Sequence, residues 1–225
     1  MKDLLVRLVI VIIAGAVVAG VLSGLAGRWD LWNVWAAVGI FVVLGSLQTL
    51  ALHRKNPGLF KEQMQPAGRE LRGRRPLHIG FNLMFFLALI IAGLDQRFHW
   101  SDIVPPAGVV AGLVIFATGV GLYLWAMLSN PFFSSIARIQ ADRGQRVISK
   151  EPYGIVRHPG YAGLLLFVIA FAVALNSLLS IIPAVAAAAC LAGMTVLEDR
   201  MLREELAGYA DYAAKVHYRL IPGVW

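Results

Sequence analysis

The chain has 225 residues, of which 59% are hydrophobic and 15% are charged, and its mean hydropathy is +0.71. This fraction of charged side chains is too small to cover the surface of a water-soluble domain. The composition therefore excludes that class and indicates a polytopic membrane protein. The net charge is +7, and the positively charged residues concentrate in the loops. This distribution indicates membrane topology and contact with lipid headgroups, and it argues against a nucleic-acid partner.

Six apolar segments are each close to the ~20 residues that a helix needs to cross the hydrocarbon core. They comprise residues 4–26, 31–52, 77–94, 108–128, 161–175 and 178–197. We therefore predict an all-α integral membrane fold, a polytopic bundle of about six transmembrane helices. The last two form a tight helical hairpin, because little more than Asn176-Ser177 separates them. Since the fifth segment is short, they are either two full spans or one bent re-entrant hairpin.

Lys and Arg gather in alternate connections. They occur at the start of the chain, in the second connection (54–75), in the fourth (138–157) and in the tail (200–219), whereas the connections around 28–30 and 95–102 are short and nearly neutral. The positive-inside rule then places both termini and both long connections in the cytoplasm, in agreement with six crossings. A bacterial inner membrane is the compartment we expect.

The second connection, residues 56–76, is rich in Gly, Pro and Arg. We expect a cytoplasmic loop with a short interfacial helix at 59–64, whose arginines meet anionic membrane lipid or, alternatively, substrate. Cys190 is alone within the last apolar run, which leaves no disulfide within the chain and no thiolate metal cluster, so we predict no metal site.

The fourth connection is the most informative loop. Pro131 ends the helix before it, since proline lacks an N–H and biases Asn130 away from helical angles. Residues 132–158 are polar but interleaved with Phe, Ile, Val and Tyr, which argues against disorder. Because loops of this length are usually functional, we expect a folded cover for a polar cofactor at the membrane surface.

A motif follows this loop and a charged cluster follows the hairpin. The motif runs from Arg157 to Gly163 as Arg-His-Pro-Gly-Tyr-Ala-Gly, and the cluster is Glu198-Asp199-Arg200-Met201-Leu202. A hairpin returns both to one membrane face. The free N–H groups at the start of the fifth helix favour a carboxylate, and Glu198 is placed to receive an ammonium group. Alternatively, the His and Tyr are interfacial anchors and Glu198 is a solvated helix-end charge.

These motifs resemble those of the isoprenylcysteine carboxyl methyltransferase family, integral-membrane S-adenosylmethionine-dependent enzymes related to phospholipid N-methyltransferases. The resemblance covers about the last hundred residues, including Gly208-Tyr209 with Tyr212 and Arg219-Leu220-Ile221-Pro222. It divides the chain into N-terminal transmembrane helices with a basic loop, residues 1–100, and a methyltransferase core, residues 101–225, with a C-terminal helix.

The resemblance implies a site and a cofactor, S-adenosyl-L-methionine. It assigns cofactor contacts to Gln140, Gln145, Arg146, Val147, Ile148, Tyr153, His158, Pro159, Gly160, Tyr161 and Glu198. His158, Tyr161 and Glu198 are the candidate catalytic residues, and Arg157 and Met194 are the candidate substrate contacts. Met194 departs from the family pattern, because the prenyl-protein enzymes carry a substrate-binding Arg there.

The resemblance implies carboxyl O-methylation of an isoprenylcysteine, a lipophilic or prenylated acceptor. In-line transfer from an activated sulfonium needs mainly positioning and desolvation, and an amine or thiol acceptor would also need a base such as His158 or a nearby Tyr. Two alternatives remain: a methyltransferase for a phospholipid amine or small thiol on the same scaffold, and a non-enzymatic membrane protein such as a transporter.

Overall fold

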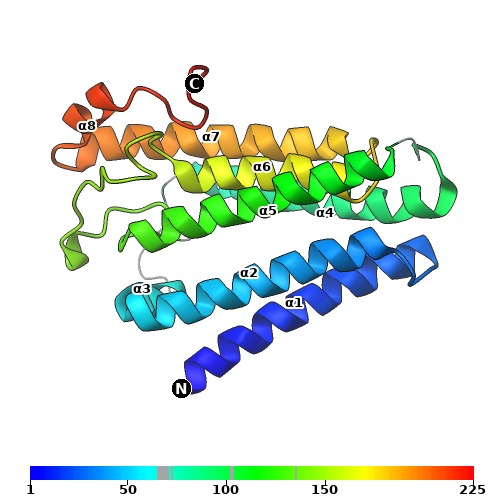
Figure 1. Cartoon of the computed structure of the whole chain (residues 1–225). Coiled ribbons are helices and arrows are strands. Elements are labelled where there is room, and N and C mark those ends of the chain that lie inside the picture. The colour runs from blue at the N-terminus through cyan, green and yellow to red at the C-terminus, as the bar shows by residue number, and fades with distance from the viewer. Residues whose placement is uncertain (65–70, 72, 102–103, 135) are drawn as a thin grey trace.

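The computed structural model describes residues 1–64, 71, 73–101, 104–134 and 136–225, and within these ranges every regular element is a helix. Figure 1 shows long helices running side by side, with short helices at one end of the bundle. The elements are α1 (Lys2–Ala26), α2 (Trp32–Lys55), α3 (Pro57–Met64), α4 (Arg74–Phe98), α5 (Pro106–Ser129), the 3-10 turn η1 (Ala141–Arg143), α6 (Pro159–Ala174), α7 (Ile181–Glu205) and α8 (Tyr209–Lys215).

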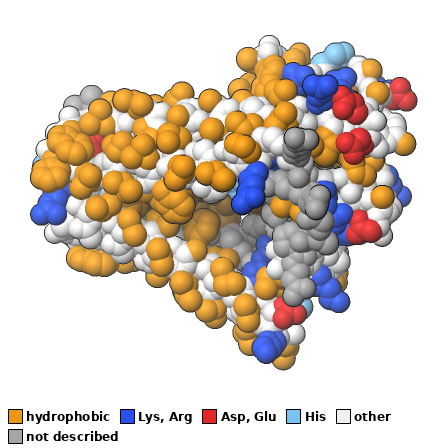
Figure 2. Space-filling view, turned by 180° about the vertical axis from the view of Figure 1, so that it is seen from behind, with side chains coloured by type: hydrophobic (Ala, Val, Ile, Leu, Met, Phe, Trp, Pro, Cys, Tyr) orange, Lys and Arg blue, Asp and Glu red, His pale blue; other side chains and the backbone are white. Residues whose placement is uncertain are grey.

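Five helices, α1, α2, α4, α5 and α7, are long and apolar enough to cross a membrane, and α6 is a shorter apolar helix. Large apolar side chains such as Ile10, Ile13 and Val17 are more than half exposed along α1, which suits contact with lipid and not with water. Hydrophobic side chains cover most of the bundle's length, while charged ones gather mainly at one end (Figure 2). The predicted polytopic all-α membrane fold is confirmed.

The α6–α7 hairpin reaches the far end of the bundle. Asn33, at the start of α2, donates its side-chain N–H to the Ala174 carbonyl at the end of α6, with an N···O distance of 3.1 Å. Ser177, in the turn, donates to the Asp95 carboxylate near the end of α4 over 2.6 Å. The turn therefore lies level with the α1–α2 and α4–α5 connections.

Helices α5 and α6 approach so closely that glycine is required at their crossing. A Cβ added at Gly163 would lie 2.6 Å from the Gly119 carbonyl oxygen, and one added at Gly119 would lie 2.7 Å from the Gly163 carbonyl. No carbon atom fits at that distance. Gly163 therefore serves the close approach of another helix backbone. The crossing fixes α6, and with it the motif at its start, against α5.

The basic connections lie at one end of the bundle. The start of α1, α3, residues 130–158 and α8 all occur there (Figure 1). A short helix is observed over the expected 59–64 as α3, and its interfacial position stays a prediction; the second-connection residues Arg69 and Arg72 lie outside the described residues. Helix α7 continues eight residues past the apolar run predicted to end at 197, because Glu, Arg, Met and Leu are good helix formers. Glu198 and Asp199 therefore stand on a rigid helix.

Candidate active site

A cavity of about 280 Å³ lies at the charged end of the bundle. Helices α4, α5, α6, α7 and α8 and the connection from α5 to α6 contribute to its wall. Apart from Pro159, every site residue expected from the sequence lines it: Gln140, Gln145, Arg146, Val147, Ile148, Tyr153, Arg157, His158, Gly160, Tyr161, Met194 and Glu198. The structure therefore brings together residues up to 58 positions apart in the chain (140 to 198).

Glu198 and Tyr161 face each other across the hairpin. The Tyr161 hydroxyl donates to the Glu198 carboxylate with an O···O distance of 2.8 Å. The same hydroxyl accepts hydrogen bonds from the Arg74 guanidinium, at 3.0 Å from Nη2 and 3.3 Å from Nε. A carboxylate and a guanidinium, which carry opposite charges, therefore both hydrogen-bond to the Tyr161 hydroxyl at the cavity wall.

His158 caps α6, and Pro159 occupies the first helical position, where its missing N–H costs nothing. Pro159 is buried and does not line the cavity, so it sets the start of the helix. A Cβ added at Gly160 would lie 2.8 Å from the Phe133 ring, so this glycine accommodates an aromatic side chain of the loop. The amide groups of Gly160 and Tyr161 follow Pro159 in the first turn, where backbone N–H groups have no partner within the helix.

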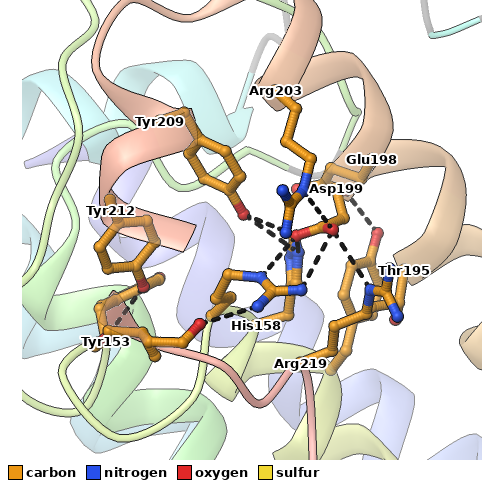
Figure 3. A network of polar contacts seen from close by, with 12 residues as sticks. Tyr153, His158, Thr195, Glu198, Asp199, Arg203, Tyr209, Tyr212 and Arg219 are labelled. Atoms are coloured by element: carbon orange, nitrogen blue, oxygen red, sulfur yellow. Dashed lines mark hydrogen bonds and ion pairs between the residues drawn. The ribbon is translucent and has the colours of Figure 1, made fainter. Parts of the chain in front are cut away.

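Asp199 is the centre of a buried polar network (Figure 3). It accepts two hydrogen bonds from the buried Arg157 guanidinium, at 2.7 Å from Nε and 3.2 Å from Nη2. The Tyr209 hydroxyl donates to it over 3.1 Å, and the His158 Nε2 atom lies 3.3 Å from the same carboxylate oxygen. Arg203 and Arg219 add ion pairs at 3.2 Å each. The network joins α6, α7, α8 and the tail behind the cavity.

The third guanidinium nitrogen of Arg157, Nη1, donates to the carbonyls of Val216 and His217, at 2.7 and 2.8 Å. All three nitrogens of this side chain are therefore engaged within the protein, which favours a role in holding the tail. Its predicted substrate contact stays a prediction. Met194, the other candidate, is 2% exposed and lines the apolar part of the cavity together with Leu191.

The connection from α5 to α6 folds on itself and covers the site. Gln140 is buried: its amide N–H donates to the Gln145 side chain over 2.6 Å, its side-chain amide donates to the Phe132 carbonyl, and its side-chain oxygen accepts from Arg143. The Tyr153 hydroxyl donates to the Ala126 carbonyl at the end of α5 over 3.2 Å. Around Gln140 the cover is thus held by contacts within the connection, and at Tyr153 it is tied to α5.

Three tyrosines of the site remain neutral at ordinary pH. Burial raises the pKa of Tyr153 and of Tyr212 above the usual value, and burial together with the Asp199 charge raises the pKa of Tyr209. The Tyr212 hydroxyl uses its proton to donate to the Tyr153 carbonyl over 2.7 Å. These phenols therefore act as hydrogen-bond donors.

The residues present fit S-adenosylmethionine. Glu198 supplies an anion for an ammonium group, and the first turn of α6 supplies backbone donors for a carboxylate. The half-buried side chains of Val147 and Ile148, in the same cavity wall, offer apolar contact to a planar base. The contact and catalytic roles of the individual residues remain predictions.

Sequence reasoning missed two buried charged groups. Asp199 was expected only as a member of the charged cluster 198–202, and Arg74 only as one of the cations of the second connection. A signal existed for the first: Asp199 lies four residues before Arg203, and an i, i+4 ion pair forms there. For Arg74, the only available signal was its position three residues before the apolar run that starts at 77.

Comparison with known families agrees with the geometry. Residues 107–207 match the family model described as phospholipid methyltransferase. The interval contains α6, α7, all of α5 but its first residue, and the cover between α5 and α6. This match confirms the predicted relationship to the integral-membrane methyltransferases. No curated protein matches the chain.

Proposed function

Because residues 107–207 are related to the phospholipid methyltransferases, we propose that this integral membrane protein transfers a methyl group from S-adenosylmethionine to a lipophilic acceptor. One observation carries the proposal: all the predicted cofactor residues except Pro159 line a single cavity that continues into apolar side chains of the bundle. A polar donor and a lipid-soluble acceptor meet only where such surfaces join.

Within this proposal, Glu198 holds the ammonium group of the cofactor and the first turn of α6 holds its carboxylate. The 140–153 cover closes over the adenosine, with Gln140, Gln145, Arg146, Val147, Ile148 and Tyr153 on that side. When bound, the cofactor supplies an activated methyl group on a sulfonium. Tyr161 orients Glu198 through its 2.8 Å hydrogen bond, and His158 is fixed beside Asp199.

The apolar wall belongs to the acceptor. Phe81, Leu164, Leu191 and Met194, from α4, α6 and α7, surround the inner part of the cavity. These side chains exclude water and favour a hydrocarbon chain. Catalysis then consists mainly of aligning the acceptor with the methyl carbon and of desolvating both groups. The basic end of the bundle faces the cytoplasm and contacts anionic lipid headgroups, as the positive-inside rule implies.

The acceptor that the motif resemblance favours is an isoprenylcysteine carboxylate. A second candidate, a phospholipid amine, is favoured by a specific observation: Met194 is buried and apolar at the position where prenyl-protein enzymes carry an arginine, and the matching family model describes phospholipid methyltransferases. A small thiol fits the apolar wall less well than either.

Thermal unfolding in the presence of S-adenosylhomocysteine tests the proposed activity class. A ligand at about 100 times its Kd stabilises the folded state by roughly 2.7 kcal/mol, which raises the Tm of a chain this size by roughly 5–11 °C. Adenosine serves as the matched control, because it lacks the ammonium and carboxylate groups. A Tm that neither compound moves would favour a non-enzymatic membrane protein.

A further inference from the structure

The apolar side chains of α3 pack inside the protein. Leu59 and Phe60 are 0% and 4% exposed, and they form one cluster with Leu52 of α2 and Met127 of α5. An isolated helix of eight residues is marginal in water, so this packing is what fixes α3. The helix is therefore anchored to two long helices and can hold a neighbouring loop in place.

Glu62 of α3 forms a buried ion pair with the cover, the connection from α5 to α6. Its carboxylate accepts from Arg138 Nη2 over 3.3 Å and from the Ser134 hydroxyl over 3.4 Å. The side chains of Glu62 and Arg138 are only 8% and 10% exposed. Arg138 Nη1 donates to Asp142, whose side chain is 60% exposed and belongs to the same connection. Glu62 is thus the acid that ties this arginine to the bundle, and breaking a buried pair from one side is costly.

Two neutral hydrogen bonds reinforce the same junction. The Gln63 side-chain amide donates to the Phe133 carbonyl over 3.1 Å. The backbone N–H of Leu71, further along the second connection, donates to the Ala137 carbonyl over 2.9 Å. These contacts all hold one short segment of the cover, 133–138. Every residue of this segment that the structure describes lines the cavity, namely Phe133, Ser134, Ile136, Ala137 and Arg138.

The same segment also contacts the start of α6. A Cβ added at Gly160 would lie 2.8 Å from the Phe133 ring. That ring packs edge-on against Tyr123 of α5, with the ring centroids 5.3 Å apart. The proposed function places the cofactor carboxylate at the first turn of α6, so the position of Phe133 determines how that turn is covered. A shift of the segment 133–138 would therefore move the cofactor side of the cavity wall.

We propose that α3, through Glu62 and Gln63, is a clasp for the cover, and that Glu62 is a positioning residue for S-adenosylmethionine binding that acts through Arg138. This inference rests on the proposed methyltransferase function and adds to it a residue outside the matched interval 107–207. Glu62 is not among the cavity-lining residues, but it holds the segment that is. A cover ordered before the cofactor arrives lowers the ordering cost of binding, so the clasp acts on affinity and not on the transfer step.

Calorimetric titration of the purified protein with S-adenosylhomocysteine tests the clasp. Glu62→Gln keeps the shape of the side chain and removes its charge, so it should raise the Kd by at least about tenfold, or 1.4 kcal/mol. The matched control is Asp142→Asn, which removes the exposed acid bound to the same guanidinium and should leave the Kd within about twofold. Arg138→Gln should match Glu62→Gln, and the double variant should be no worse than either, because each change removes the same interaction.

Two further readouts separate positioning from a general loss of structure. Hydrogen exchange of the ligand-free protein should rise at residues 136–148 in Glu62→Gln and stay unchanged in α6 and α7. In methyl transfer to native membranes, Glu62→Gln should raise the KM of S-adenosylmethionine about tenfold and leave kcat at saturating cofactor within about twofold. Gln63→Ala removes a neutral hydrogen bond and leaves no buried charge unpaired. It should raise the Kd of S-adenosylhomocysteine about twofold or more, which tests the clasp even if Glu62→Gln does not fold.

The outcomes separate the two proposals. If the wild type does not bind S-adenosylhomocysteine, the proposed function fails, and the hydrogen-exchange comparison still decides whether Glu62 holds the cover. If the wild type binds it but Glu62→Gln and Gln63→Ala leave the Kd unchanged, only the clasp is overturned. Exchange that rises equally in the cover, α6 and α7, or a kcat that falls at constant KM, would also overturn it, because Glu62 would then support the whole fold or the transfer step.

Discussion

Replacing Asp199 with alanine should be among the most destabilising single changes at this end of the protein. The carboxylate is 1% exposed and Arg157 is 4% exposed, so the variant leaves a buried guanidinium without its counter-ion. Breaking a buried ion pair from one side costs about 3–5 kcal/mol. For a chain of 225 residues this corresponds to a fall in Tm of roughly 6–20 °C.

The assay is thermal unfolding of the purified protein in detergent, followed by tryptophan fluorescence. Arg203→Ala is the matched control: it removes a partner of the same carboxylate whose side chain is 42% exposed, and an exposed pair contributes about 0–1 kcal/mol. The double variant Arg157→Met/Asp199→Leu should recover much of the lost stability, because it removes both charges and keeps the volume. Equal Tm values for Asp199→Ala and Arg203→Ala would refute the reasoning that this network holds the tail.

Three further predictions concern the cofactor, the helix crossing and pH. Glu198→Gln should weaken S-adenosylhomocysteine binding by roughly 1.5–3 kcal/mol in a calorimetric titration, since a charged hydrogen-bond partner is lost while the shape is kept; an unchanged Kd would remove Glu198 from the cofactor site. Gly163→Ala should lower stability by about 1–3 kcal/mol because its Cβ would lie 2.6 Å from the Gly119 carbonyl, whereas Gly121→Ala, with nothing within 4 Å, should be neutral or stabilising. The raised pKa of Tyr209 means that the folded state keeps a proton that the unfolded state loses near pH 10.0, so stability present below that pH should decline above it. Tm measured between pH 8 and 11 should fall less steeply in Tyr209→Phe, and an identical slope would contradict this assignment.

The architecture could be predicted because hydrophobicity alone dictates it. Apolar runs of about 20 residues have few alternatives in lipid, and the tight Asn176-Ser177 turn forces a hairpin. The hairpin in turn places Glu198 beside Tyr161, so the pairing across the cavity follows from topology. The location of the cover over the cavity follows as well, since both of its ends are fixed by neighbouring helices.

The buried charges could not be predicted in the same way, because their burial depends on tertiary contacts of short segments. Asp199 is enclosed by Tyr209 on α8 and by Arg219 in the tail, and neither short segment has a hydrophobic pattern that fixes its position. Arg74 is buried because α4 begins with this residue, directly after Gly73 and three residues before the apolar run. A hydropathy profile assigns Arg74 to the loop, whereas the left-handed conformation of Gly73 starts the helix there and places Arg74 in the cavity wall. The division of the chain into residues 1–100 and 101–225 remains a prediction. Arg74, which belongs to residues 1–100, also contributes to the cavity wall.

The central claim is methyl transfer from S-adenosylmethionine to a membrane lipid or lipid-modified acceptor, and radiolabel tests it most directly. The purified protein is incubated with methyl-labelled S-adenosylmethionine and native membranes, which are then extracted with organic solvent. We expect label in the extracted lipid or prenylated fraction, with at least about tenfold less for Glu198→Gln at limiting cofactor concentration. Label that stays in the aqueous cofactor pool for the wild type as for the variant would contradict the account.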